Sequence, residues 1–349
     1  MKLSHLAAAI LLTVAGLTGC APSQPGEGLL VQHQVTIQPP PPPTVRLTFV
    51  GDLMLARLPG EAIARGEDPF ASFAAVLTGS DYSVGNLESV IATGGKRVPK
   101  AYNFRASPKA IPLLARYFQA VSVANNHSGD FGKDALAEEL DLLTRGGLPY
   151  FGGGMDFAEA HAPLIVEKNG IRIALLGYSE IELRSFEAGP ATPGTAWSDD
   201  AQVVADISAA RTQYKADLVI PFLHWGLEYH FKPSERQRSL AHKLIDAGAD
   251  VVVGGHPHVT QGAEYYKDRL IVYSLGNFVF DDFKDVTADL GEPSRTSWVL
   301  RLTLTRTGLQ RWDTVVARTD DNGFPRPVKG AVSPCGSAES RAIGQCAAK

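Results

Sequence analysis

The chain has 349 residues, of which 20% are charged, and its formal net charge at pH 7 is −4. This slightly acidic balance includes no basic run, so nucleic acid is not an expected partner. The composition after Val45 is ordinary for a soluble globular protein, and roughly 300 residues suffice for one large α/β domain with a buried core.

The first residues have the pattern of an export signal. Lys2 precedes a short apolar run at 6–17, and this run ends in "LTGC" at Cys20. The pattern predicts a signal peptide over 1–19, and its cysteine resembles a bacterial lipobox, which implies cleavage before Cys20 and lipidation of that sulfur. The alternative is an ordinary signal peptide with an incidental cysteine. Lipid chains would anchor the protein, because no later segment is long and apolar enough to span a bilayer.

A proline-rich segment follows, so residues 20–44 are interpreted as a lipidated tether. Five consecutive prolines favour stiff polyproline II, which would lift the domain off the membrane. We expect an extracytoplasmic, lipid-anchored protein of the cell envelope, at the outer membrane or in the periplasm if the cell is Gram-negative. Residues 319–349 are interpreted as a C-terminal tail, in which Cys335 and Cys346 could form a local disulfide.

Between tether and tail, residues 45–318 alternate strand and helix and then become mostly strand. Apolar periodicity predicts helices at 107–118, 132–147, 198–214 (with Ser198 as N-cap) and 233–249. Apolar runs predict strands at 44–52, 119–125, 217–226 and 250–255, and further β structure over 264–280 and 297–318. Asn169-Gly170 predicts a hairpin with a type I′ turn. This order favours a central sheet covered by helices, with antiparallel additions.

Polar residues of the types that bind metals follow these strands repeatedly. Asp52 follows "LTFVG"; Asn125, Asn126 and His127 follow "AVSVA"; His224 follows "LVIPFL"; His256 and His258 follow "VVVGG". In open α/β sheets, sites form in the crevice beyond the carboxyl ends of the strands, so we expect these endings to converge. Histidine and carboxylate are standard ligands of zinc, manganese and iron, and asparagine can add a neutral oxygen.

The predicted metal ligands are Asp52, Glu88, Asn126, His224, His256 and His258, which could hold one or two divalent ions (Mn, Zn or Fe). His127 would then be free to act as a general acid or base. The predicted substrate contacts are Asn125, Trp225, Glu228, Tyr229 and Asn277. Arg57, Lys100 and Arg105 could meet carboxylates or phosphates, although a solvated surface charge is the more common role. Single motifs have alternatives, since Asp52 could cap a helix and "NNH" could form a turn.

Six motifs in a fixed order give the chain a family resemblance. They are "FVGDLMLAR", "VGNLESVI", "SVANNHSGDFG", "FLHWGLEYH", "GADVVVGGHPHVTQ" and "IVYSLGNFVFD". Together they closely resemble the CapA family, named for capsule and poly-γ-glutamate synthesis, over about residues 45–281. That family is similar in fold to the calcineurin-type metallophosphoesterases. The resemblance therefore implies a β-sandwich flanked by helices rather than a doubly wound sheet.

The phosphoesterase pattern implies a role for each matching residue. Asp52 matches the first aspartate, Asn126 the ligand asparagine, His127 the histidine that assists the leaving group, and His224, His256 and His258 the later histidines. Glu88 stands roughly where a bridging aspartate would be. Two motifs depart from the pattern, because "GDLML" lacks a histidine ligand and "GNLE" replaces Gly-Asp-x-x-Asp. These departures leave one metal, two metals or a site that no longer binds metal tightly.

The resemblance implies a lipoprotein of capsule or poly-γ-glutamate synthesis. Its reaction would be metal-assisted hydrolysis or transfer at an amide or phosphoester of an anionic cell-surface polymer, with a membrane synthase complex as a further partner. One alternative is a non-catalytic scaffold or export factor, which the altered motifs favour. Another is a generic phosphoesterase. A serine hydrolase is not expected, because the sequence has no G-x-S-x-G motif.

Overall fold

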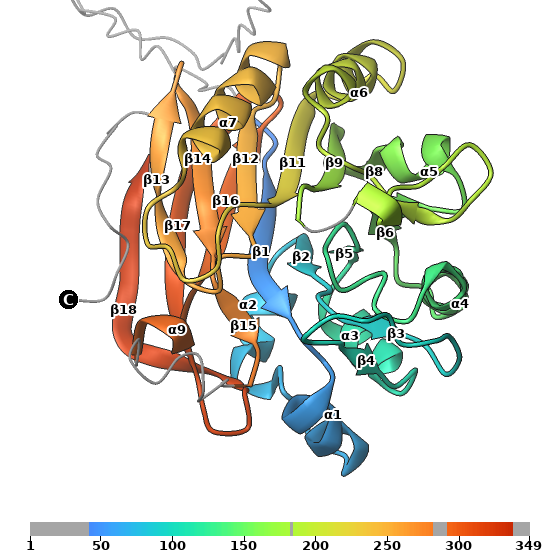
Figure 1. Cartoon of the computed structure of the whole chain (residues 1–349). Coiled ribbons are helices and arrows are strands. Elements are labelled where there is room, and N and C mark those ends of the chain that lie inside the picture. Colours follow the sequence, from blue (N-terminus) through green and yellow to red (C-terminus); the bar gives the residue numbers. More distant parts are fainter. Residues whose placement is uncertain (1–41, 182–183, 282–291, 338–349) are drawn as a thin grey trace, which may run out of the picture. The chain divides into compact units, whose positions relative to one another are not determined.

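The computed structural model describes residues 42–181, 184–281 and 292–337 (Figure 1). The predicted signal peptide, nearly all of the predicted tether and Cys346 lie outside these ranges. None of the helices within them is long and apolar enough to cross a membrane.

Two β-sheets form the body of the domain. The eight-stranded sheet has the order β18-β17-β16-β1-β2-β5-β6, with β15 paired to β1, and the six-stranded sheet has the order β13-β14-β12-β11-β9-β8. The strands of the first are β1 (Val45–Leu53), β2 (Tyr82–Asn86), β5 (Ala120–Ser122), β6 (Tyr150–Phe151), β15 (Asn277–Val279), β16 (Thr296–Thr305), β17 (Gly308–Thr319) and β18 (Pro325–Ser337). Those of the second are β8 (Leu164–Lys168), β9 (Ile171–Ser179), β11 (Leu218–His224), β12 (Val251–Gly255), β13 (Thr260–Tyr266) and β14 (Arg269–Leu275).

Helices cover the outer faces of both sheets (Figure 1). They are α1 (Arg57–Ala64), α2 (Ala74–Thr78), α3 (Ala110–Tyr117), α4 (Lys133–Arg145), α5 (Phe157–His161), α6 (Asp200–Thr212), α7 (Glu235–Ala247) and α9 (Glu292–Arg295). Short 3₁₀ helices lie at Ala71–Phe73 and Arg184–Phe186, and short strand pairs join β3 (Val90–Ile91) to β4 (Arg105–Ala106) and β7 (Gly153–Gly154) to β10 (Gly194–Thr195). Helices α3 and α4 share an apolar cluster with β5, and α6 and α7 share one with β11 and β12.

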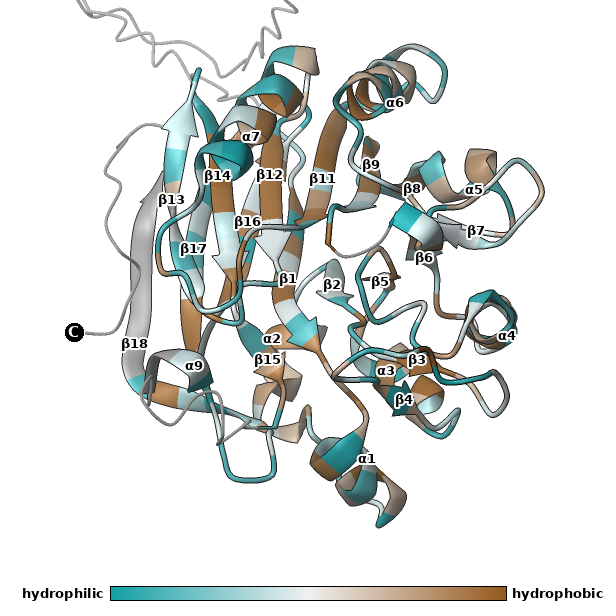
Figure 2. Ribbon diagram, in the orientation of Figure 1, coloured by the Kyte–Doolittle hydropathy of each residue, from teal (hydrophilic) through white to brown (hydrophobic). Residues whose placement is uncertain are grey.

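The layer between the two sheets is apolar, because side chains alternate along each strand. Leu47 and Phe49 of β1 belong to the same buried cluster as Ile220 of β11 and Val253 of β12. Burying one such side chain contributes about 1.5–3 kcal/mol to folding. Figure 2 shows the same apolar character along β11 and β12. The predicted α/β fold, a β-sandwich flanked by helices, is therefore confirmed.

Several local predictions can be compared with the described structure. Asn169 and Gly170 have φ values of 53° and 72°, as the predicted type I′ turn between β8 and β9 requires. The predicted N-cap at Ser198 is wrong: Asp199 caps α6 by accepting from two backbone N–H groups, whereas the Ser198 hydroxyl donates to Glu180. At the other end, residues 325–337 of the region interpreted as a tail form β18, which pairs with β17.

The direction of the strands places the candidate site. Strands β1, β2 and β5 run parallel to one another in the first sheet, and β9, β11, β12 and β14 do so in the second. Parallel strands present their carboxyl ends at one edge of a sheet. The residues that follow β1, β2, β5, β11 and β12 can therefore meet at the junction of the two sheets.

Candidate metal centre

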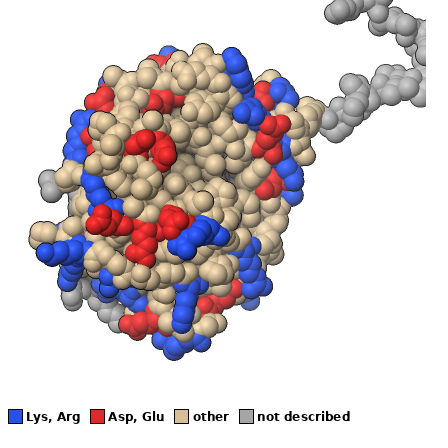
Figure 3. Space-filling model, turned by 90° about the vertical axis from the view of Figure 1, so that its right-hand side faces the viewer, with Lys and Arg blue, Asp and Glu red and all other residues tan. Residues whose placement is uncertain are grey.

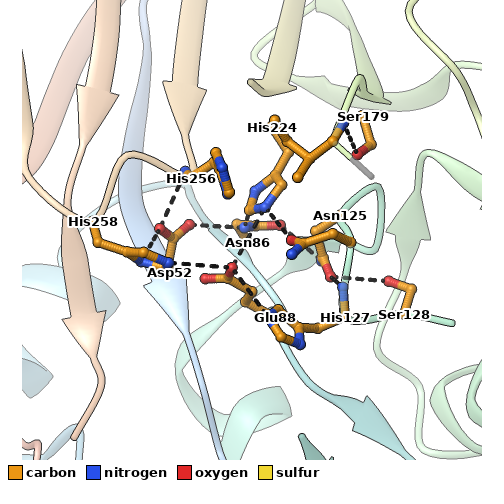
Figure 4. A network of polar contacts seen from close by, with 12 residues as sticks. Asp52, Asn86, Glu88, Asn125, His127, Ser128, Ser179, His224, His256 and His258 are labelled. Atoms are coloured by element: carbon orange, nitrogen blue, oxygen red, sulfur yellow. Dashed lines mark hydrogen bonds and ion pairs between the residues drawn. The ribbon is translucent and has the colours of Figure 1, made fainter. Parts of the chain in front are cut away.

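The structure brings all six predicted metal ligands together at this junction. Figure 4 shows five of them, and Asn126 joins them through its 2.8 Å contact with His224. Asp52 lies in β1, Glu88 follows β2, Asn126 follows β5, His224 ends β11, and His256 and His258 follow β12. Every one of these side chains is buried. The residues that the sequence groups therefore lie close together, while their individual contacts depend on the tertiary structure.

Asp52 links the two sheets. A Cβ atom at Gly51 would lie 1.8 Å from the carbonyl oxygen of Gly276, so only glycine lets β1 approach this loop so closely. Beyond it, Asp52 Oδ1 accepts a hydrogen bond from Asn86 Nδ2 at 2.8 Å, and Oδ2 accepts one from the backbone N–H of His256 at 3.2 Å. The carboxylate of the first sheet thus fixes the loop that follows β12 in the second.

Glu88 is a buried carboxylate without hydrogen-bond donors. Neither of its side-chain oxygens has a hydrogen-bond partner within the described residues. Its Oε1 lies 3.4 Å from His224 Nε2 and 4.0 Å from the Nε2 atoms of His127 and His258. Burial raises the pKa of Glu88 above its ordinary value. Because an unpaired buried carboxylate is costly, a cation held between Glu88 and the imidazoles would stabilise this arrangement.

Two imidazoles of the second sheet are held in their neutral form. Burial lowers the pKa of His224 to about 3 and the pKa of His256 well below its usual value. His224 Nε2 lies 2.8 Å from Asn126 Oδ1 and its Nδ1 lies 3.0 Å from Asn86 Nδ2, while His256 Nδ1 is buried with no hydrogen-bond partner in the described part of the chain. Neutral imidazole is the form that ligates metals, so both side chains are suited to that role.

The imidazole of His258 differs from the other two because its pKa is raised. Burial alone lowers the pKa of His258, but the carboxylates of Glu88 and Asp52 outweigh that effect, so the pKa of His258 is raised. Its Nδ1 lies 2.8 Å from Asn277 Oδ1 and 3.6 Å from Asp52 Oδ2. In the absence of a metal, a protonated His258 would partly neutralise the two carboxylates.

The segment that carries His256 and His258 has an unusual backbone. Their φ values are 92° and 57°, in the left-handed region that residues other than glycine seldom adopt. In this segment the imidazole of His258 lies against Asp52 and Glu88, and the ring of His256 faces that of His224 (Figure 4). Strained backbone of this kind persists only where its surroundings hold it, and it clusters at functional sites.

The donor set fits a divalent transition metal. Potential ligand atoms lie within 4.8 Å of one another in three groups, which are Glu88 with His224 and His256, Asp52 with Glu88 and His258, and Glu228 with His256 and His258. Glu88 belongs to two of these groups. Mixed imidazole nitrogen and carboxylate oxygen is the donor chemistry of zinc, manganese and iron sites.

His127 lies at the edge of this cluster and is held from two sides. Its Nδ1 lies 2.7 Å from Asp130 Oδ2, and its ring stacks on Phe104 at a centroid distance of 4.1 Å. The Lys100 ammonium lies 2.8 Å from the other oxygen of Asp130. This arrangement leaves His127 Nε2 directed toward Glu88. Sequence reasoning missed Asp130, although its position three residues after His127 in "NNHSGD" was a usable signal.

Asn86 is a second residue that sequence reasoning missed. Its amide donates to Asp52, meets His224, and accepts from Asn125 Nδ2 at 3.1 Å, so it lies at the middle of the cluster (Figure 4). The signal was its position at the end of β2, which repeats that of Asp52 at the end of β1. This central side chain is a neutral amide, so it adds no negative charge to the cluster.

Three predicted substrate contacts are buried and have partners inside the protein. Trp225 is fully buried, and its indole N–H donates to the carbonyl oxygen of Tyr273 at 2.8 Å, so it belongs to the core. The Asn125 amide donates to Asn86 and to the Leu87 carbonyl, and its oxygen accepts from His127 N–H, so it orders the loop. The buried Asn277 contacts His258 and therefore positions a candidate ligand.

The other two predicted substrate contacts lie beside the centre. Glu228 is exposed, and its carboxylate lies within 4.8 Å of ligand atoms of His256 and His258. Tyr229 is half-buried, with its ring centroid 5.8 Å from that of His258. Both follow β11 in the loop after His224, where a substrate could reach them.

Comparison with known proteins gives the same family along most of the chain. Residues 46–282 match the family model described as "Bacterial capsule synthesis protein PGA_cap". "Capsule biosynthesis protein CapA" of Bacillus anthracis is 34% identical over 300 residues, covering 82% of this chain and 70% of that protein. "PGA biosynthesis protein CapA" of Bacillus subtilis is 34% identical over 240 residues, covering 67% of this chain and 63% of that protein.

A solved structure of lower similarity was also found. The NAD nucleotidase NadN of Haemophilus influenzae aligns with a TM-score of 0.46 at 15% identity, over 82% of this chain and 60% of that chain.

Proposed function

The chain belongs to the family of bacterial capsule synthesis proteins, as its six motifs predicted, and we propose that it is a metal-dependent hydrolase or transferase acting on an anionic polymer. The descriptions of two relatives, "Capsule biosynthesis protein CapA" and "PGA biosynthesis protein CapA", support capsule material or poly-γ-glutamate as the polymer class. The buried centre at the sheet junction supports the metal chemistry.

The observation that carries this proposal is the unsatisfied set of buried ligand atoms. Both oxygens of Glu88 and the Nδ1 atom of His256 are buried without a hydrogen-bond partner within the described residues. Native proteins satisfy nearly all buried polar groups, so such atoms call for an explanation. A divalent cation satisfies carboxylate and imidazole at once and explains both features. The ligands we assign to it are Asp52, Glu88, Asn126, His224, His256 and His258.

Residues around the metal then have separate roles in the reaction. A bound divalent ion supplies Lewis-acid polarisation of the carbonyl or phosphoryl group. His127 holds its Nδ1 proton against the Asp130 carboxylate, which leaves Nε2 to give a proton to the leaving group or to take one. Lys100 holds Asp130 in place through its 2.8 Å contact. Tyr229 and Glu228 contact the polymer outside the centre.

A specific observation favours a second candidate function, a non-catalytic scaffold or export factor. Asn86 stands in the middle of the centre and already bonds to Asp52 at 2.8 Å and contacts His224 at 3.0 Å. This amide links part of the cluster without a metal. In that case the site is a structural remnant, and the protein acts by holding polymer or a membrane synthase complex. Simple phosphoester hydrolysis is the third outcome that the test below separates.

We further propose a location in the cell envelope. The capsule biosynthesis relatives support this location, and the sequence pattern around Cys20 supports a lipid anchor. Residues 45–318 then form the catalytic domain, to which the edge strand β18 is added. A membrane synthase complex is the partner that polymer synthesis requires.

The proposal is tested by metal content and activity together. Elemental analysis of the wild type should find stoichiometric Mn, Zn or Fe, and His256→Ala should lose it along with cleavage of a glutamyl polymer. His242→Ala is the matched control, because His242 lies on α7 and bonds to Glu264 outside the centre. Wild-type protein without metal, even after reconstitution, would point to the scaffold. Cleavage of phosphoesters but not of glutamyl polymers would point to the generic phosphoesterase.

A further inference from the structure

A pocket of about 320 Å³ adjoins the metal centre behind a single aromatic ring. Phe104 lines this pocket, and its ring stacks on the imidazole of His127 with an interplanar angle of 29°. We refer to it as the Phe104 pocket. It lies one side chain away from the residue proposed to move the proton, so a group bound there sits close to the reacting bond.

The described lining of the Phe104 pocket carries cationic side chains. Arg57 and Arg97 line it, and none of its lining residues in the described part of the chain is acidic. The Arg57 guanidinium donates through Nε to Asp281 Oδ2 at 2.9 Å, and the carboxylate of Asp281 is completely buried. Arg97 donates through Nε to the side-chain oxygen of Asn103. Both contacts orient a planar guanidinium at the wall of the pocket.

The backbone at Arg57 supports a positional role for this side chain. Arg57 has a φ of 50°, in the left-handed region, at the first residue of α1. Its salt bridge with Asp281 joins α1 to the segment that follows β15. A non-glycine residue in this conformation is strained, so the surrounding contacts hold it there. The guanidinium is thus pre-positioned rather than free to sample the surface.

Three of the other lining residues are aromatic. Tyr102 and Phe131 line the Phe104 pocket beside Phe104 itself, and the guanidinium carbon of Arg105 lies 4.4 Å from the centroid of the Phe131 ring. Aromatic rings pack against methylene groups, while arginine binds carboxylate in a planar, bidentate manner. The combination fits a carboxylate on a short aliphatic stem better than a bare inorganic anion.

We propose that the Phe104 pocket binds a free carboxylate of the polymer next to the bond that reacts, with Arg57 and Arg97 as the residues that select it. This inference rests on the proposed function, because the polymer is identified there. Basic and acidic side chains are interspersed over the face of the domain drawn in Figure 3. Local pockets, rather than a broad basic surface on that face, therefore account for recognition of an anionic chain.

The test is a binding titration with two matched oligomers. One is a glutamate oligomer linked through its γ-carboxyl groups, whose α-carboxylates remain free. The other has the same length, with those carboxylates converted to amides. Wild-type protein, Arg97→Gln and Arg65→Gln are titrated with each by calorimetry. Arg65 is the control, because it is an exposed arginine next to α1, pairs with Glu67 and does not line the pocket.

We expect weaker binding of the charged oligomer only. Arg97→Gln should weaken binding of the charged oligomer by about tenfold, as expected for one charge-assisted contact, and leave binding of the amide oligomer unchanged. Arg65→Gln should alter neither. Equal wild-type affinity for the two oligomers would overturn the proposal, as would an Arg97→Gln protein that behaves like Arg65→Gln.

A second variant tests whether weaker binding is caused only by a change in folding. Arg57→Lys keeps the charge that pairs with Asp281 but loses the bidentate fork, so it should weaken binding of the charged oligomer and keep the wild-type unfolding temperature. Unchanged binding in Arg57→Lys would remove Arg57 from the proposal. Failure of the two proposals is distinguishable: Arg97-dependent binding without metal or cleavage contradicts only the hydrolase, and cleavage insensitive to Arg97→Gln contradicts only the pocket.

Discussion

The two sheets contribute different chemistry to one centre. The eight-stranded sheet supplies oxygen donors, and the six-stranded sheet supplies the imidazoles of His224, His256 and His258. In both sheets, polar residues lie at or just beyond the carboxyl ends of parallel strands. The pattern in the sequence is therefore common to both halves, while the ligand chemistry divides between them.

Burial also shifts pKa values in opposite directions in the two halves. Burial, with Glu88 nearby, raises the pKa of Asp52 to about 6, and burial raises that of Glu88. The same burial lowers the pKa of His224 and His256. Desolvation thus disfavours the charged forms of Asp52, Glu88, His224 and His256, because it penalises ions of either sign, whereas the two carboxylates raise the pKa of His258. A divalent cation at the junction would reverse the penalty for the carboxylates and use His224 and His256 in the neutral form that they already have.

The largest effect on this comparison should come from removing the carboxylate that faces the imidazoles. Glu88→Gln keeps the shape of the side chain but removes its charge, so metal affinity should fall by more than about 100-fold, the upper end of what loss of a supporting residue costs. The metal-free variant should be at least as stable as metal-free wild type at pH 8, because a buried unpaired carboxylate is gone. Metal titration and thermal unfolding check the two parts; retained affinity would remove Glu88 from the ligands.

The next effect separates proton transfer from metal binding. Asp130→Asn removes the carboxylate that fixes His127, so kcat should fall by about 100-fold, at the low end of the contribution of a general acid or base. Metal content should stay at the wild-type level. Asp134→Asn, an exposed substitution at the start of α4, is the control. Loss of metal in Asp130→Asn would instead make Asp130 part of the metal site.

A smaller effect is the pH dependence of metal affinity, which reports Asp52 of the first sheet and His258 of the second. The pKa of Asp52 in the metal-free protein is about 6, above its ordinary value, so Asp52 takes up a proton as the pH falls through about 6, and the pKa of His258 is raised as well. A metal must displace these protons, and apparent affinity should therefore fall by at least about tenfold per pH unit below 6. Metal titrations between pH 5 and pH 8 measure the slope. A flat profile would mean that Asp52 is not a ligand.

The smallest functional effect should come from Trp225, which follows β11 and was predicted to contact substrate. Trp225→Phe loses the hydrogen bond to the Tyr273 carbonyl, so the free energy of unfolding should fall by about 1–3 kcal/mol. KM for the polymer should not change, because Trp225 is fully buried. Denaturant unfolding and steady-state kinetics provide the two readings. A raised KM with unchanged stability would restore the predicted substrate contact.

The sequence by itself determined the family, the fold class and the group of residues that meet at the junction of the sheets. Strand endings such as "FVGD" and "VVVGGHPH" are local patterns, and short-range chemistry is enough to recognise them. The Asn169-Gly170 turn was predictable for the same reason, since two adjacent residues set its geometry.

The tertiary structure decided what each residue contacts. Asn86 lies between Asp52 and His224, which are 34 and 138 positions away in the chain, and no local pattern encodes those distances. Trp225 and His224 are neighbours in sequence, yet their side chains have different surroundings. Trp225 packs into the apolar cluster that contains α6 and α7, whereas His224 contacts Asn126 and Asn86 in the site. Burial, which shifts the pKa values of the centre, likewise exists only once both sheets have packed.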